Sequence, residues 1–153
     1  MRVRLVCVGR LSRPFKPVFS HYADLLAPYV RLEVIEVPEV PLSRGLEEVR
    51  KGEGEALLRR LKPGALTVVL DRSGEQTDSE SLSGRLAEWK VRGRSDFQFV
   101  VGGAAGLSGP VAAAADWTWS LSNLTFPHQL ARCIVAEQLY RAIKIERGEP
   151  YHH

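Results

Sequence analysis

Short apolar runs alternate along the chain with segments in which apolar residues recur at helical spacing. The apolar runs predict strands at residues 3–8, 32–37, 66–70, 97–101 and 117–121. The helical spacing predicts helices near 17–26, 43–62 and 77–92, a short one opening at 109, and a long one at 127–146. This alternation is typical of one α/β domain with a mostly parallel sheet, spanning residues 1–153.

Local signals add detail to three of these elements. Asp71–Gly74 has the composition of an exit turn after the third predicted strand, whose continuous apolar run suits a central position. Thr77 and Glu80 have the spacing of a capping box at the start of a helix. Gly52 and Gly54 are expected to weaken the middle of the second long helix.

Residues 97–131 contain a single formal charge, Asp116, in a chain of which 25% is charged. Each half of this stretch is a strand that runs into a turn rich in Gly, Ser, Asn or Pro and then into a helix. The carboxyl ends of neighbouring parallel strands form a crevice where ligands bind. We therefore expect the ligand site here, with glycines allowing close approach of the backbone.

The last predicted helix is apolar on every side over residues 130–136. Such a helix is buried all round, and one face of a sheet cannot cover it alone. Another helix or a second subunit must do so, and we expect a homodimer.

Composition narrows the class of protein. A length of 153 residues suits one domain, and a net charge of +3 permits an anionic partner without requiring one. Cys7 and Cys133 are far apart and no Cys/His cluster exists, which argues against a metal site. Residues 1–8 do not suit a signal peptide, and the glycines within 97–115 argue against a membrane helix. We expect a cytoplasmic protein that uses neither metal nor membrane.

Two turns are candidates for binding chemistry. The first, Gly102–Gly106, is either a cofactor loop or a tight turn that needs positive φ. Its sequence matches neither the GxGxxG motif nor a Walker loop, which disfavours a nucleotide-binding oxidoreductase. The second holds Ser122, Asn123 and Thr125, which either cap a helix or offer backbone groups to an adenine-like ring. His128 follows it as a base, an RNA contact or a structural residue.

The segments GGAAGLS, WSLSNLTFPHQLARCIVAEQLYRAIKI and RGEPYH, with LVCVGRL and LTVVLDRSGE, strongly resemble the RlmH-type methyltransferases of the SPOUT superfamily. The resemblance runs from end to end. It implies methyl transfer from S-adenosyl-L-methionine to N3 of a pseudouridine in 23S ribosomal RNA, on ribosomes or large subunits. The alternative is a ribosome-assembly factor that binds RNA and cofactor without catalysis.

The resemblance also implies a structure and a set of site residues. The part from about 66 to 153 should form a trefoil knot, and the tail of one subunit should reach the other subunit's site. The catalytic candidates are His128, Tyr151 and His152, and the RNA-binding candidates are Arg132 and Arg141. If neither arginine touches phosphate, the basic surface is expected at Arg10 and Arg13 instead. The cofactor-binding candidates are Leu70, Gly102, Leu121, Ser122, Asn123, Leu124, Thr125 and Phe126. The tail departs from the family by ending in His153, where relatives carry Lys or Arg.

Overall fold

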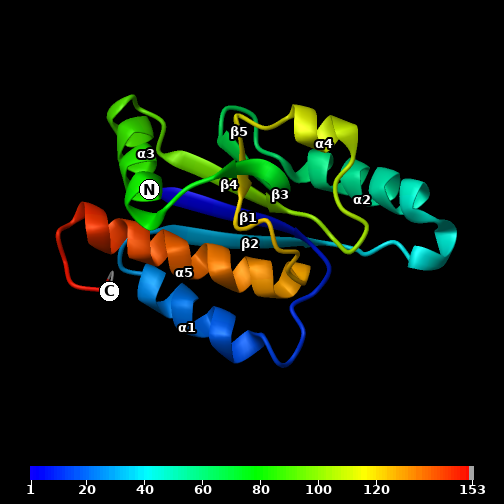
Figure 1. Cartoon of the computed structure of the whole chain (residues 1–153), viewed down its shortest axis with the longest axis horizontal. Helices are drawn as coiled ribbons and strands as arrows, with labels where there is room; N and C mark the ends of the chain where they lie inside the picture. Colours follow the sequence, from blue (N-terminus) through cyan, green and yellow to red (C-terminus); the bar gives the residue numbers. More distant parts are fainter. Residues whose placement is uncertain (152–153) are drawn as a thin grey trace.

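The structure is a computed structural model that describes residues 1–151, and within them it has five strands in one parallel sheet (Figure 1). The strand order is β2-β1-β4-β3-β5, and every neighbouring pair is parallel. The elements are β1 (Arg2–Val8), α1 (Lys16–Leu26), β2 (Arg31–Val37), the 3-10 turn η1 (Leu42–Arg44), α2 (Leu46–Arg60), β3 (Leu66–Gln76), α3 (Ser79–Val91), β4 (Asp96–Val101), α4 (Gly109–Ala113), β5 (Trp117–Ser120) and α5 (His128–Glu146). The predicted α/β domain is confirmed.

Helices cover both faces of the sheet because successive side chains along each strand point to opposite faces. Val3, Leu5 and Cys7 of β1 belong to one core with α1, α3 and α5, whereas Val6 and Val8 belong to a second core with α2 and α4. Both sets are at most 1% exposed. The central strands are therefore apolar on both faces, as the continuous runs in the sequence predicted.

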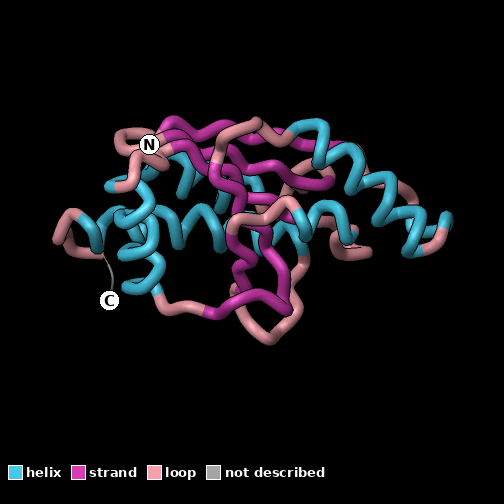
Figure 2. Tube along the Cα trace, turned by 90° about the horizontal axis from the view of Figure 1, so that it is seen from above, coloured by secondary structure: helices cyan, strands magenta, loops and turns pink. Residues whose placement is uncertain are grey.

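Strand β3 is longer than the sequence predicted, and the prediction of an exit turn at Asp71–Gly74 is wrong. The strand shifts register against β5 between Leu70 and Glu75 and then pairs again through Gln76. Figure 2 shows this extension reaching beyond the main sheet before the chain enters α3. Pairing with Trp119 and Ser120 of β5 holds the extension, and Glu75 Oε2 accepts a hydrogen bond of 2.9 Å from Trp117 Nε1.

One further local prediction needs correction, and the glycines of α2 gain a role in packing. The N-cap of α3 is Asp78 rather than Thr77, because the Asp78 carboxylate accepts a hydrogen bond of 2.7 Å from the Ser81 amide. The glycines of α2 are packing positions. A Cβ on Gly54 would clash with Ser108 Oγ, and one on Gly52 would meet Val40 at 3.0 Å.

Helix α5 is covered by its own chain on the faces that the sequence showed to be apolar. It packs against α1 and α3, and Figure 1 shows α1 lying beside it. Cys133, Val135 and Ala136 are at most 3% exposed, while Leu130 and Ile134 remain partly exposed. Neighbouring helices thus supply most of the cover, and the homodimer stays a prediction. Strand pairing does not reveal how the chain is threaded, so the trefoil knot also stays a prediction.

Candidate functional site

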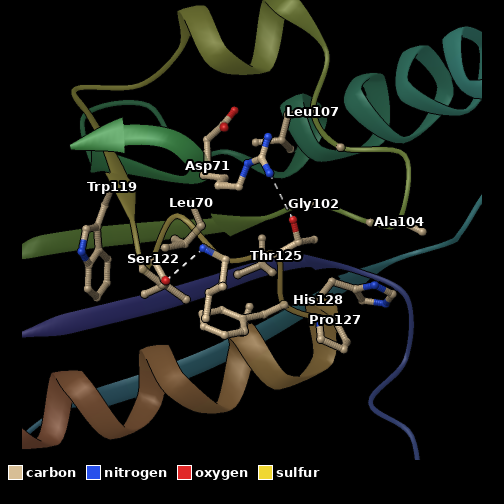
Figure 3. Close-up of a pocket in the computed structure, with 18 residues that line it drawn as sticks. Leu70, Asp71, Gly102, Ala104, Leu107, Trp119, Ser122, Thr125, Pro127 and His128 are labelled. Carbon is tan, nitrogen blue, oxygen red and sulfur yellow. Dashed lines mark hydrogen bonds between the residues drawn. The ribbon is translucent and has the colours of Figure 1, made fainter. Parts of the chain in front are cut away.

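A pocket of about 700 Å³ opens at the bend of β3 and the carboxyl ends of β4 and β5, beside the first turn of α5 (Figure 3). Leu70 at the bend of β3, Gly102 after β4 and Leu121 after β5 all line it. These chain segments come together because parallel strands end at the same edge of the sheet. The crevice predicted from the sequence is therefore where a cavity lies.

The glycine turn after β4 forms one wall of the pocket. A Cβ on Gly102 would lie 2.7 Å from Leu107 Cδ2, and Leu107 itself lines the cavity. Within the turn, positive φ occurs at Gly106, where φ is +83°, and the Gly106 amide donates to the Gly103 carbonyl at 3.1 Å. The tight turn with positive φ is confirmed at Gly106, and the cofactor loop stays a prediction.

The run after β5 folds back on itself and lines the opposite wall. The Ser122 hydroxyl accepts a hydrogen bond of 3.0 Å from the Leu124 amide, which shapes a tight bend. Leu124 is 69% exposed although it lines the pocket, so an apolar side chain stands at the rim. Thr125 and Phe126 line the cavity as well.

Asn123 is the exception among the cofactor candidates. It does not line the pocket, and its Oδ1 accepts a hydrogen bond of 2.7 Å from Gln76 Nε2. Its side chain therefore braces the run against the extension of β3 and does not face the cavity.

Several lining residues were missed from the sequence. Asp71 and Arg72 follow Leu70 on β3 and bring charge to a pocket that we expected to hold almost none. The Asp71 carboxylate accepts from the amide and hydroxyl of Ser73 at 2.9 and 3.0 Å, and Arg72 Nη1 lies 3.5 Å from Thr125 Oγ1. Their position directly after an apolar strand could have indicated that they line the pocket. The prediction of an exit turn at Asp71–Gly74 led away from this.

His128 lies at the pocket end of α5, with 21% of its side chain exposed. Its Nε2 is 3.4 Å from Glu39 Oε1 but makes no hydrogen bond within the described residues. In Figure 3 the imidazole points away from Ser122. The Nε2 atom is itself enclosed beside Glu39, so this unbonded nitrogen does not face the open pocket.

Glu53 of α2 lies next to the glycine turn, and its position there was not predicted from the sequence. It is 3% exposed, its Oε2 accepts a hydrogen bond of 3.0 Å from the Val40 amide, and its Oε1 has no partner within residues 1–151. A Cβ on Gly103 would meet that Oε1 at 2.9 Å. Burial raises the pKa of Glu53, and the nearby Glu39 charge adds to the rise.

The whole chain matches one family of enzymes. A family model described as a predicted SPOUT methyltransferase matches residues 1–152. The chain belongs to the SPOUT methyltransferase family. This confirms the resemblance seen in the sequence.

Relatives of this chain and one solved structure agree with that assignment. Two proteins named Ribosomal RNA large subunit methyltransferase H, from Acetivibrio thermocellus and Pelotomaculum thermopropionicum, are 41% and 43% identical to it. Each match covers 99% of this chain, with 99% and 98% of the relatives covered. A crystal structure of a probable methyltransferase from Bordetella pertussis Tohama I shares the fold, with a TM-score of 0.57 at 16% identity, over 92% of this chain and 93% of that one.

The RNA-binding prediction for Arg132 is wrong in this SPOUT chain. Arg132 is 1% exposed, and its Nη1 donates to Glu36 Oε2 at 2.6 Å while its Nη2 donates to the Gly9 carbonyl at 3.0 Å. A guanidinium enclosed in this way cannot reach a phosphate. The apolar residues around Arg132 on α5 were a signal of burial. Its hydrogen-bond partners, Glu36 on β2 and Gly9 after β1, could not be identified from the sequence.

Arg141 is also engaged within the chain. Its Nε donates to Glu137 Oε1 at 2.9 Å, and 24% of its side chain is exposed. The hydrogen bond with Glu137 raises the pKa of Arg141. The guanidinium also lies 4.9 Å from the centre of the Tyr151 ring, so its local role is to hold the tail.

Tyr151 packs onto the C-terminal half of α5, whereas the pocket lies at the first turn of that helix. Its ring meets that of Tyr140 edge-on at 4.7 Å. Tyr140 is 12 positions beyond His128 on α5, so the two residues are roughly 18 Å apart along the helix at 1.5 Å per residue. Within one chain Tyr151 does not reach His128, and His152 lies outside the described residues.

Within residues 1–151 no helix is both long and apolar enough to cross a membrane. The same residues contain no group of three or more His, Cys, Asp or Glu side chains that would suit a metal ion.

Proposed function

We propose that this chain transfers a methyl group from S-adenosyl-L-methionine to N3 of a pseudouridine in 23S ribosomal RNA, within the ribosome or large subunit. The observation that carries the proposal is the pocket at the bend of β3 and the carboxyl ends of β4 and β5. It occurs in a SPOUT family chain whose full-length relatives are named as methyltransferases of large-subunit ribosomal RNA.

The pocket suits the donor because it combines apolar surface with exposed backbone. Leu70, Leu121 and Phe126 offer apolar contacts to a flat purine ring, while the bend at Ser122 presents backbone groups to its edge. Gly102 has no side chain to occupy the space next to Leu107. We assign these residues to cofactor binding, with Leu124 and Thr125 at the rim.

S-adenosyl-L-methionine supplies an electrophilic methyl group for in-line displacement, and the protein positions the nucleophile. N3 of a pseudouridine attacks only after it loses its proton. His128 lines the pocket, so we assign it as the group that accepts this proton. Its Nε2 is enclosed beside Glu39 Oε1 at 3.4 Å, so the proton would go to the other ring nitrogen.

The tail completes the site only through a second subunit. Because Tyr151 packs against Tyr140, roughly 18 Å along α5 from His128, a homodimer that places one subunit's tail at the other's pocket would unite Tyr151 and His152 with His128. Leu130 and Ile134, which stay partly exposed on α5, are available to such an interface.

Transfer of a labelled methyl group to protein-free 23S RNA, isolated large subunits and whole ribosomes tests the proposal. We expect one methyl group at a pseudouridine in at least one of these substrates, and none in RNA prepared without pseudouridine. The variant Gly102→Val should abolish both cofactor binding and transfer, and Gly84→Ala is the matched control because a Cβ there meets no atom within 4 Å. Tight cofactor binding without any transfer would instead favour the non-catalytic assembly factor.

A further inference from the structure

The loop between β1 and α1, residues 9–15, is tied to α5 at the pocket end of that helix. The Arg132 guanidinium donates to the Gly9 carbonyl at 3.0 Å, and Gln129 Oε1 accepts from the Ser12 amide at 2.5 Å. The Leu11 amide donates to Glu36 Oε2 at 2.8 Å. Gln129 directly follows His128, so the loop runs beside the pocket, as its dark blue trace does in Figure 3.

The backbone of this loop is also fixed by its own turn. The amides of Phe15 and Lys16 both donate to the Ser12 carbonyl, at 3.0 and 3.2 Å. Pro14 and Pro17 restrict the backbone on either side of Lys16. The loop is thus held in one conformation before any partner arrives, which lowers the entropy that binding would cost.

Three exposed cations stand on this fixed segment. Arg10, Arg13 and Lys16 are exposed, and none of them makes an ion pair or a side-chain hydrogen bond within residues 1–151. Most other exposed cations around α3 and the end of α5, such as Arg92 and Arg147, pair with a carboxylate. In the loop at residues 9–15 the backbone groups make hydrogen bonds, whereas the side chains of Arg10, Arg13 and Lys16 make none within residues 1–151.

Nearby carboxylates cancel these charges only in part. Glu36 pairs with Arg132, and the charge of Arg10 also helps to lower the pKa of Glu36, while Glu39 lies against Gly9 and His128. The first turn of α1 contains no acidic residue. A rigid loop beside the pocket that carries three cations without an ion pair within residues 1–151 offers a complement to a polyanion.

We propose that the segment 10–16 is the surface on which this chain holds the phosphate backbone of its RNA substrate, through Arg10 and Arg13 with Lys16 beside them. The inference rests on the proposed function for the identity of the polyanion. Arginine suits the task because its planar fork binds phosphate oxygens in pairs. Such contacts fix the position of the RNA, so that the target base falls over the pocket, while the base is recognised within it.

The test compares RNA binding by two double variants over a series of salt concentrations. Arg10→Ala with Arg13→Ala removes the proposed contacts, whereas Arg59→Ala with Arg60→Ala removes two exposed arginines at the far end of α2. Each phosphate contact contributes about 0.7 to 0.9 to the slope of log affinity against log salt. We expect the first variant to lower that slope by about 1.5 for protein-free 23S RNA, and the second to leave it unchanged.

Further measurements separate contact from damage. The first variant should bind S-adenosyl-L-methionine like the unaltered chain, and Arg10→Lys with Arg13→Lys should recover most of the slope. An unchanged slope in the alanine variant, or an equal loss in the Arg59 and Arg60 control, would overturn the inference. Loss of binding to large subunits with normal binding to protein-free RNA would also overturn it, in favour of an acidic ribosomal protein.

Methyl transfer reports separately on the proposed function. At saturating RNA the alanine variant should keep its kcat while its KM rises about tenfold or more, because the loop binds substrate without touching the reacting atoms. An unaltered chain that binds RNA with the expected slope but transfers no methyl group would refute the proposed function and leave the binding surface supported.

Discussion

Replacing Arg132 by Met should destabilise the fold and loosen the loop at residues 9–15. Methionine keeps the apolar stem but removes the bonds to Glu36 Oε2 and to the Gly9 carbonyl. Hydrogen bonds of a charged donor contribute about 1.5–3 kcal/mol each. Part of this free energy is recovered, because Glu36 is 34% exposed to water and keeps its hydrogen bond from the Leu11 amide. Arg132 Nε has no hydrogen bond to lose within the described residues.

The net loss should therefore be about 2–3 kcal/mol in the free energy of unfolding. For a domain of this size that corresponds to a fall of roughly 7 °C in Tm. Thermal and denaturant unfolding measure the effect, and hydrogen exchange at the Leu11 and Ser12 amides should accelerate. Arg92→Met is the control, because its pair with Glu88 is 68% and 59% exposed and should contribute under about 0.5 kcal/mol.

The pH dependence of the Arg132→Met effect gives an independent check. Burial acts to raise the pKa of Glu36, but hydrogen bonds from Arg132 and the Leu11 amide outweigh it and the pKa lies below its ordinary value. The pair therefore stabilises the fold above about pH 4.3, and the stabilisation is lost as pH falls through the lower folded pKa. The difference between the two proteins should shrink below that pH. A loss under about 1 kcal/mol at neutral pH, or one that does not change in acid, would refute the reasoning.

The pocket and its expected partner subunit give three more predictions. Gly103→Ala places a Cβ 2.9 Å from Glu53 Oε1 and should lower S-adenosyl-L-methionine affinity about tenfold, as measured by calorimetry. The control Gly84→Ala should leave that affinity unchanged and stabilise the chain by about 0.5–1 kcal/mol. Equal cofactor affinity in the two variants would remove the turn from the site. Light scattering should give twice the 17.0 kDa chain mass, and a stable monomer would exclude the shared site. Mixing inactive His128→Ala and Tyr151→Ala subunits should restore about a quarter of the activity by random pairing, and no recovery would place both residues outside one composite site.

Much of the fold could be predicted from the sequence because its signals are local. A continuous apolar run such as 66–70 indicates a strand buried on both faces, and alternation with helices makes the sheet parallel. Parallel strands bring the turns after them to one edge, so Gly102 and Leu121 could be expected at the same edge of the sheet. The two strands before them are not neighbours as expected, because β3 lies between β4 and β5.

Features that depend on partners distant in the chain were decided by the tertiary structure alone. Arg132 stands among apolar residues of α5, and its burial follows from Glu36, 96 positions away, and from the carbonyl of Gly9. Glu53 faces Gly103 because the glycines of α2 let that helix approach closely. Strand β3 continues past Leu70 because β5 offers it a second register. Each of these contacts joins groups whose pairing no local pattern encodes, since burial and hydrogen bonding depend on which segments the fold brings together.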